Sequence, residues 1–275
     1  MRPDPHELGT YLREAEAIAR AGGAVLAEHA TRLAEMRTEF KGRRELVTEA
    51  DRATERAVVE RLLARFPEHA VLAEEGVLTP RGLPHRASEW TWILDPLDGT
   101  TNFVHGIPFY CVALALAFQG DPVLGVVHAP ALGHTYAAAR GCGALRNGAP
   151  IQVSATADLR DALLCTGFSY NRNEPGRDDN SARLARVLPA CRDLRRLGSA
   201  ELDLCLTAAG HYDGYWEMYL MPYDVAAGAV VVQEAGGRVT DLDGGQAWLH
   251  GASILASNGR LHDPLRALVG PAPRA

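Results

Sequence analysis

The stretch DPLDGTTNF at residues 95–103 decides how this sequence is interpreted. It directly follows the apolar run at residues 90–94, which predicts that its acids lie at the carboxyl end of a strand. Asp95 and Asp98 are three residues apart across a predicted turn. The turn brings two carboxylates and the Leu97 carbonyl oxygen near one point. Such hard oxygen ligands suit Mg²⁺, so the stretch indicates a magnesium site.

The second half of the same stretch is typical of an anion site. Gly99, Thr100 and Thr101 offer backbone N–H groups and hydroxyls where a helix can begin. Acids for a metal and amides for a phosphate therefore lie within eight residues. A plain Asp/Pro/Gly turn, with Asp capping a helix, is the structural alternative that these residues alone leave open.

Acidic residues recur at comparable places elsewhere. Glu74 and Glu75 end the short apolar run 70–73. Glu217 ends a predicted strand, and Asp224 lies in the first turn of a predicted helix. A solvated turn would also explain the glutamates, and the helix dipole favours an acid at Asp224 without any metal. Taken together, acids at the carboxyl ends of strands form the pattern of a two- or three-metal phosphoryl site.

The apolar periodicity predicts a layered α/β chain. Helices are predicted at residues 7–30, 49–66, 181–188, 200–209 and 222–235, with a last helix after residue 258. Strands are predicted at residues 70–73, 90–94, 110–118, 123–128, 135–139, 162–167, 194–197, 212–218, 238–240 and 253–256. The strands between residues 110 and 139 predict an antiparallel meander.

Four local signals refine this picture. Gly22-Gly23 indicates a close helix crossing, and Asn147-Gly148 is typical of a type I′ turn. The polar segment Asn171–Asn180 is predicted to be a mobile loop. Thr48-Glu49-Ala50-Asp51 fits a capping box with Asp in place of Glu. The capping box by itself favours a helix cap over chemistry at Asp51.

Length and charge limit the class of protein. With 275 residues, one large domain or two intimate ones are expected. We expect a single catalytic domain over 1–275, with an N-terminal lobe at 1–150 and a C-terminal α/β lobe at 151–275. Lys plus Arg number 28 and Asp plus Glu 34, a net charge of −6, which argues against non-specific binding to nucleic acid or anionic membranes.

The cysteines and the apolar runs bear on the compartment. The five cysteines are odd in number and form no C-x-x-C pair, which argues against a disulfide framework and a zinc knuckle. The first twelve residues lack the apolar core of a signal peptide, and no apolar run reaches membrane-spanning length. These features predict a cytoplasmic protein.

The motifs, taken in order, resemble the inositol monophosphatase family of Mg²⁺-dependent, lithium-sensitive phosphatases. Residues 95–103 match the family's first motif throughout. Residues 223–228 and 234–237 match its second motif, except that Tyr223 replaces the usual Trp. The shorter family motifs L-V-T-x-x-D, E-E and G-[ST]-A match residues 46–51, 74–75 and 198–200.

The resemblance implies a fold, an activity and a set of roles. The implied fold belongs to the α/β class and is a layered α/β/α/β/α sandwich with two mixed or antiparallel sheets. The implied activity is Mg²⁺-dependent hydrolysis of a small phosphorylated polyol, and the implied oligomer is a homodimer. Two or three Mg²⁺ ions would be held by Glu74, Asp95, the Leu97 carbonyl, Asp98 and Asp224. Asp51 and Thr100 would orient the attacking water. The substrate would contact Asp98, Gly99, Thr100, Gly198, Ser199, Ala200 and Glu217.

Four functions are therefore compared. Inositol-1-monophosphatase activity is the first. The second is the same chemistry on histidinol phosphate, fructose 1,6-bisphosphate or a nucleotide 3′-phosphate. An aspartyl-phosphate phosphatase of the haloacid dehalogenase type would need D-x-D after its first strand, whereas this chain has D-x-x-D. A regulatory binding protein without catalysis ranks low, because every acid of the implied site is present.

Overall fold

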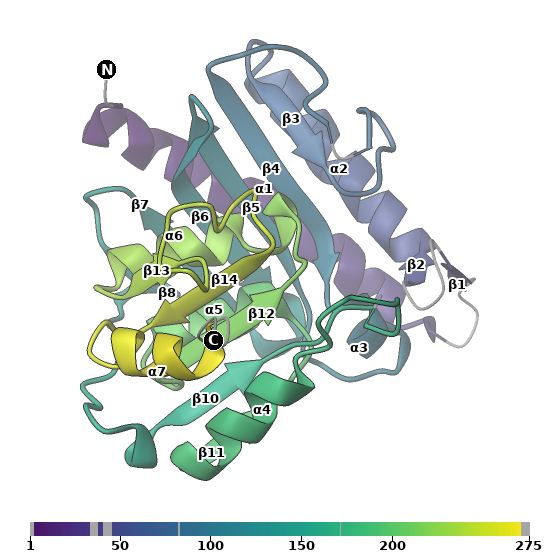
Figure 1. The fold of residues 1–275 in the computed structure, drawn as a ribbon. Helices are drawn as coiled ribbons and strands as arrows, with labels where there is room; N and C mark the ends of the chain where they lie inside the picture. Colours follow the sequence, from purple (N-terminus) through teal and green to yellow (C-terminus); the bar gives the residue numbers. More distant parts are fainter. Residues whose placement is uncertain (1–2, 34–37, 41–45, 82, 171, 271–275) are drawn as a thin grey trace.

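Two β-sheets organise the fold, and helices lie between them and on their outer faces (Figure 1). The computed structural model describes residues 3–33, 38–40, 46–81, 83–170 and 172–270. Within these ranges the strands of the first sheet come from residues 70–150 and those of the second from residues 163–257. Each sheet is thus formed by one continuous part of the sequence.

The first sheet is a meander with one parallel strand at its edge. Its order is β3-β4-β5-β6-β7-β8-β9, with bounds Ala70–Ala73, Trp90–Asp98, Cys111–Phe118, Asp121–Ala129, His134–Ala139, Ala144–Arg146 and Ala149–Pro150. β3 pairs with β4 in parallel, and the following pairs are antiparallel. The predicted meander is confirmed. Asn147 and Gly148, at φ 51° and 78°, close the β8–β9 hairpin as a type I′ turn requires.

The second sheet is mixed and smaller. Its order is β11-β10-β12-β14-β13, with β10 at Leu163–Thr166, β11 at Asp193–Arg195, β12 at Gly214–Met218, β13 at Arg238–Thr240 and β14 at Ser253–Ser257. β10 is parallel to β11 and β12, whereas β14 is antiparallel to β12 and β13. A separate hairpin of β1 (Thr38–Phe40) and β2 (Leu46–Thr48) precedes the second helix.

Helices cover both sheets and fill the space between them (Figure 1). The α-helices are α1 Pro5–Ala30, α2 Glu49–Arg65, α3 Thr100–Val104, α4 Ser181–Val187, α5 Ala200–Ala208, α6 Ala226–Glu234 and α7 His262–Val269. The 3₁₀-helices are η2 Pro130–Leu132, η3 Leu159–Asp161, η4 Leu188–Ala190 and η5 Pro222–Asp224.

Three hydrophobic cores define the layers. One core joins α1 and α2 to the outer face of the first sheet. A second core joins the inner face of that sheet to α5, α6 and the second sheet. The third joins the far face of the second sheet to α4 and α7. The predicted α/β/α/β/α sandwich is confirmed, and it buries α5 and α6 between the two sheets.

The long first helix shows how local signals and packing agree. Asp4 caps α1 by accepting the N–H of His6, and Pro5 occupies the first helical position. At Gly22 a Cβ atom would lie 2.8 Å from a Val58 methyl carbon on α2. The close helix crossing predicted from Gly22-Gly23 is therefore confirmed, because only glycine leaves room for α2 there.

Strand β4 does not end where the sequence predicted. It continues past Leu94 to Asp98, and its register against β5 shifts between Asp95 and Asp98. Pro96 has no N–H for the ladder, and the Asp95 carboxylate accepts the N–H of Leu97 at 2.9 Å. The acids therefore lie on an irregular strand end rather than in a turn beyond it.

The predicted helix at 222–235 is interrupted. It consists of η5 and α6, separated by Val225 at φ −140°. Asp224 accepts the N–H of Met221 at 2.6 Å, which closes the first turn as a separate unit. The interruption places the Asp224 side chain at the junction of the two helices.

Replacing Gly125 on β6 by Ala should destabilise the fold by roughly 1–3 kcal/mol, because a Cβ atom there would lie 2.2 Å from the Ala227 carbonyl oxygen of α6. The measurement is the midpoint of urea unfolding. Gly9→Ala on α1 is the matched control, since its Cβ meets only the end of Arg13, at 4.0 Å. Gly9→Ala should be neutral or stabilising by up to about 1 kcal/mol. Equal midpoints for the two variants would contradict the close β6–α6 packing.

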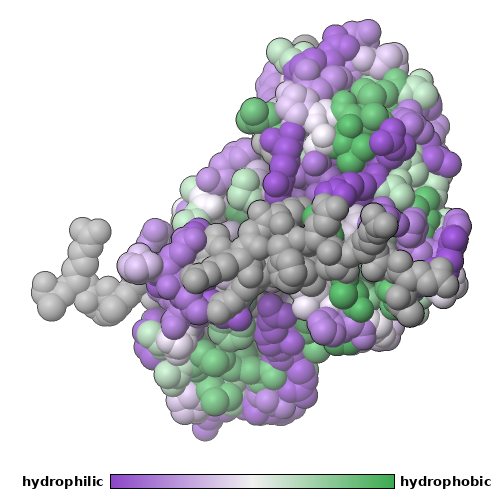
Figure 2. All heavy atoms as spheres, turned by 90° about the vertical axis from the view of Figure 1, so that its right-hand side faces the viewer, coloured by the Kyte–Doolittle hydropathy of each residue, from purple (hydrophilic) through white to green (hydrophobic). Residues whose placement is uncertain are grey.

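Figure 2 shows the face that lies on the right-hand side of Figure 1. Hydrophilic side chains cover much of it, and hydrophobic side chains gather in two separate patches, near the top and the bottom of the view. Among the described residues, no helix is both long enough and apolar enough to cross a membrane.

Candidate active site

One cavity of about 370 Å³ collects nearly all the residues singled out in the sequence. The predicted residues that line it are Glu74, Asp95, Leu97, Asp98, Gly99, Thr100, Gly198, Ser199, Ala200, Glu217 and Asp224. They come from the residue after β3, the ends of β4 and β12, the segments that lead into α3 and α5, and η5. The cavity thus lies where the two sheets and the central helix layer meet. Asp51 is the one predicted site residue that does not line it.

Gly99 turns the chain from β4 into α3. Its φ is 95°, and a Cβ atom would lie 2.9 Å from the Phe109 carbonyl oxygen. Only glycine satisfies both conditions. The helix predicted to begin after Gly99 is present as α3, and Thr100 is its first residue.

Asp51 uses its two carboxylate oxygens for two different purposes. Oδ2 accepts from the Thr48 N–H at 2.7 Å and from the Thr48 hydroxyl at 2.6 Å, which completes the predicted capping box of α2. Oδ1 accepts from the Thr100 hydroxyl at 3.2 Å. Asp51 is fully buried. The cap is therefore present, and the same side chain also contacts Thr100 in the cavity wall.

Asp98 is held by the N-terminus of α5. It accepts from the Ser199 hydroxyl at 2.6 Å and from the N–H groups of Glu201 at 2.8 Å and Ala200 at 3.3 Å. Burial raises the pKa of Asp98 to about 6, although these hydrogen bonds oppose the shift. The turn at residues 198–200 therefore binds Asp98 directly, and the N–H of Ala200 is already used in doing so.

Two residues of α5 were missed by the sequence predictions. Glu201 is fully buried and accepts from the N–H groups of Ala227 and Gly228, at the start of α6. Asp203 is also buried and lines the cavity, and its Oδ1 has no hydrogen-bond partner among the described residues. An acid in the first turn of a helix predicts only a favourable dipole interaction, so nothing local distinguished them.

The Glu217 carboxylate packs against Gly167, where no side chain is present. The Tyr215 hydroxyl donates to its Oε2 at 2.6 Å, and a Cβ atom at Gly167 would lie 1.8 Å from the same oxygen. Burial raises the pKa of Glu217 to about 7, while Tyr215 and Arg196 favour the charged form. The position of Glu217 in the cavity therefore depends on the absence of a side chain at Gly167.

The carboxyls at the floor of the cavity repel one another. Burial raises the pKa of Asp95 well above its usual range, and the neighbouring charges of Glu74, Asp98 and Asp224 raise it further. Burial and Glu74 likewise raise the pKa of Asp224. Buried carboxylates without compensating charge are costly, so this group fits the binding of divalent cations.

The side chains of these carboxyl groups do not adopt the arrangement of a complete metal-binding site in this structure. Across the described ranges, no three or more His, Cys, Asp or Glu side chains have the arrangement of a metal cluster. Asp95, Asp98 and Asp224 each accept a hydrogen bond from a backbone N–H of the protein. These bonds hold each carboxyl at the cavity and use only part of its acceptor capacity.

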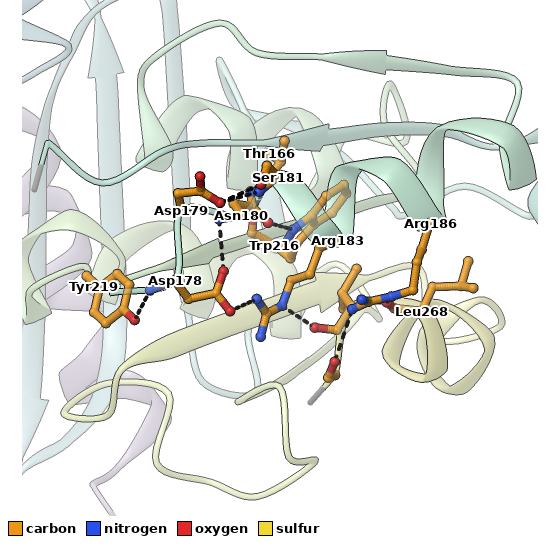
Figure 3. A network of polar contacts seen from close by, with 12 residues as sticks. Thr166, Asp178, Asp179, Asn180, Ser181, Arg183, Arg186, Trp216, Tyr219 and Leu268 are labelled. Carbon is orange, nitrogen blue, oxygen red and sulfur yellow. Dashed lines mark hydrogen bonds and ion pairs between the residues drawn. The ribbon is translucent and has the colours of Figure 1, made fainter. Parts of the chain in front are cut away.

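A loop between β10 and α4 forms one wall of the cavity, to which Phe168, Ser169, Tyr170 and Arg177 contribute. Its far end is fixed by Asn180, whose side chain donates to Thr166 at 2.8 Å and accepts from the Trp216 indole N–H at 2.8 Å (Figure 3). Residue 171 lies outside the described residues. The mobility predicted for residues 171–180 stays a prediction.

Known proteins are similar to this chain over nearly its whole length. The sequence matches the inositol monophosphatase family over residues 8–271. The inositol-1-monophosphatase of Synechocystis sp. is 40% identical over 271 residues, which cover 98% of this chain and 92% of that protein. The Nus factor SuhB of Pseudomonas aeruginosa is 38% identical over 254 residues, 92% of this chain and 93% of that protein.

A solved structure gives the same picture. The structure of an inositol monophosphatase from Anabaena superposes with a TM-score of 0.84 at 39% identity, and the match covers 95% of this chain and 96% of that one. The sandwich is thus the fold of a phosphoric monoester hydrolase. The chain belongs to the inositol monophosphatase family.

Proposed function

We propose that the chain hydrolyses inositol 1-phosphate in a Mg²⁺-dependent reaction. The observation that supports this most directly is the single cavity in which the acidic floor, the start of α3 and Glu217 meet. Glu74, Asp95, the Leu97 carbonyl, Asp98 and Asp224 would hold two or three Mg²⁺ ions. When bound, Mg²⁺ would supply the Lewis acidity and positive charge that phosphoryl transfer to water needs.

The protein's own groups would position the other reactants. The Thr100 hydroxyl donates to Asp51 or to the Leu97 carbonyl oxygen, which is 3.1 Å away. These acceptors set the direction of the Thr100 O–H bond, and the lone pairs of the hydroxyl oxygen remain as acceptors. Thr100 with Asp51 would orient a water and accept its proton. The N–H groups of Gly99 and Thr100 would bind the phosphate. Glu217 and the 198–200 turn would contact the alcohol.

Removal of the metal is the first test. Without Mg²⁺ and with excess chelator, phosphate release from inositol 1-phosphate should fall to background, and added Mg²⁺ should restore it. The same screen should include histidinol phosphate, fructose 1,6-bisphosphate and a nucleoside 3′,5′-bisphosphate. A higher kcat/KM for one of these would reassign the substrate within the same chemistry. Activity that persists in chelator would contradict the metal roles.

A regulatory function is the second candidate, since several relatives are named Nus factor SuhB. Two observations favour catalysis: every acid of the implied site is present, and all of these acids except Asp51 line one cavity. If no phosphomonoester is hydrolysed, the regulatory candidate takes precedence. Lithium sensitivity, the homodimer and a cytoplasmic location stay predictions.

A further inference from the structure

Tyr219 has an unusual backbone conformation beside the cavity. It follows β12, two residues after Glu217, and its φ is 65°. The other non-glycine residues with positive φ in the described ranges are Gln119, Asn147 and Asn180. A bulky aromatic residue rarely adopts this left-handed conformation, and it persists only where the surroundings hold it.

Two neighbours from the β10–α4 loop hold Tyr219. The guanidinium of Arg177 lies over its ring, 4.2 Å from the ring centre. The N–H of Asp178 donates to the Tyr219 hydroxyl at 3.2 Å (Figure 3). Tyr219 therefore joins the end of β12 to the loop that forms one wall of the cavity.

Arg177 is the residue that this contact places at the cavity. Both Arg177 and Tyr219 line the cavity, together with Glu217. Arg177 donates through Nη1 to Glu174 at 2.8 Å, whereas its buried Nε has no hydrogen-bond partner among the described residues. A guanidinium that lies over an aromatic face keeps its N–H donors in its own plane, where they can meet an oxygen of a ligand.

We propose that Tyr219 is a positioning residue that holds Arg177 at the cavity wall, where the guanidinium donates to an oxygen on the alcohol part of the substrate. The inference rests on the proposed phosphatase function and concerns which phosphate esters are preferred. The oxygen can belong to a hydroxyl or to a second phosphate group, and both are acceptors for Arg177. The ring of Tyr219, on its left-handed backbone, contacts this loop through Arg177 and Asp178.

The test compares substrates in single and double variants. Tyr219→Gly keeps the left-handed backbone and removes the ring, and Arg177→Ala removes the guanidinium. Each should lower the ratio of kcat/KM for inositol 1-phosphate to kcat/KM for phenyl phosphate about tenfold, mainly through KM. Tyr219→Phe should keep most of the wild-type ratio, because the ring remains. The double variant should be no worse than either single one, since both remove the same contact.

The control is Gln119→Gly. Like Tyr219→Gly, it puts glycine at a position with positive φ, but Gln119 does not line the cavity. It should leave the substrate ratio unchanged. Fructose 1,6-bisphosphate as a further substrate distinguishes a hydroxyl from a second phosphate as the acceptor. If Arg177→Ala lowers kcat/KM more for fructose 1,6-bisphosphate than for inositol 1-phosphate, the acceptor is a second phosphate. Additive losses in the double variant, or equal losses on phenyl phosphate, would overturn the inference. A wild-type protein that hydrolyses no phosphomonoester would instead refute the proposed function.

Discussion

Asp95→Asn should abolish phosphatase activity and raise the thermal midpoint of the metal-free protein. Asp95 is 2% exposed, and neighbouring carboxyls oppose its charge. Removing that charge relieves repulsion in the absence of Mg²⁺, so the midpoint should rise by roughly 2–4 °C for each kcal/mol gained. The same change removes a proposed ligand, and kcat should fall by roughly 10²–10³-fold or more.

The two readouts are measured on one preparation, by thermal unfolding in chelator and by phosphate release at saturating Mg²⁺. Asp158→Asn serves as the control, because Asp158 lies far from the acidic floor in sequence, at the start of η3, and pairs with Arg160. It should change neither kcat nor the response to chelator. Near-normal turnover of Asp95→Asn would show that Asp95 only shapes the irregular end of β4.

Asp51→Ala should lower both kcat and stability, because the two oxygens of Asp51 have separate partners. Loss of the cap should cost about 0.5–2 kcal/mol. Loss of the acceptor for Thr100 should lower kcat by roughly 10²-fold, the lower end of the range for positioned acid–base groups. The measurements are kcat at saturating substrate and Mg²⁺, and the midpoint of urea unfolding.

Thr48→Ala separates the two effects of Asp51. It removes the capping hydroxyl but leaves the Asp51–Thr100 contact in place. Stability should fall by a similar amount, while kcat stays within a few-fold of wild type. If Thr48→Ala lowers kcat as much as Asp51→Ala does, Asp51 acts through the cap alone. Full recovery of Asp51→Ala at high Mg²⁺ would instead mean that Asp51 helps to hold a metal.

Local patterns predicted the helices and strands that form the layers, because each of these elements depends on residues close in sequence. Apolar periodicity identified α1 and the strands of the meander, and Asn147-Gly148 identified the β8–β9 turn. The motif at 95–103 likewise combines acids, a positive-φ glycine and a helix start within a few residues. The same patterns missed the irregular end of β4 and the interruption at Val225, since both depend on side-chain hydrogen bonds to the backbone.

The sequence by itself therefore identified most of the acids that line the cavity and the chemistry that they suit, because residue type and spacing carry that information, but it missed Asp203. Only the tertiary structure decided how each acid is used. Asp51 meets Thr100 across 49 positions, and Asp98 meets Ser199 across 101. The room for Glu217 at Gly167 and the stacking of Arg177 on Tyr219 are likewise contacts between segments that only folding brings together. No local pattern encodes such pairs, because their geometry is set by the packing of both sheets around the central helices.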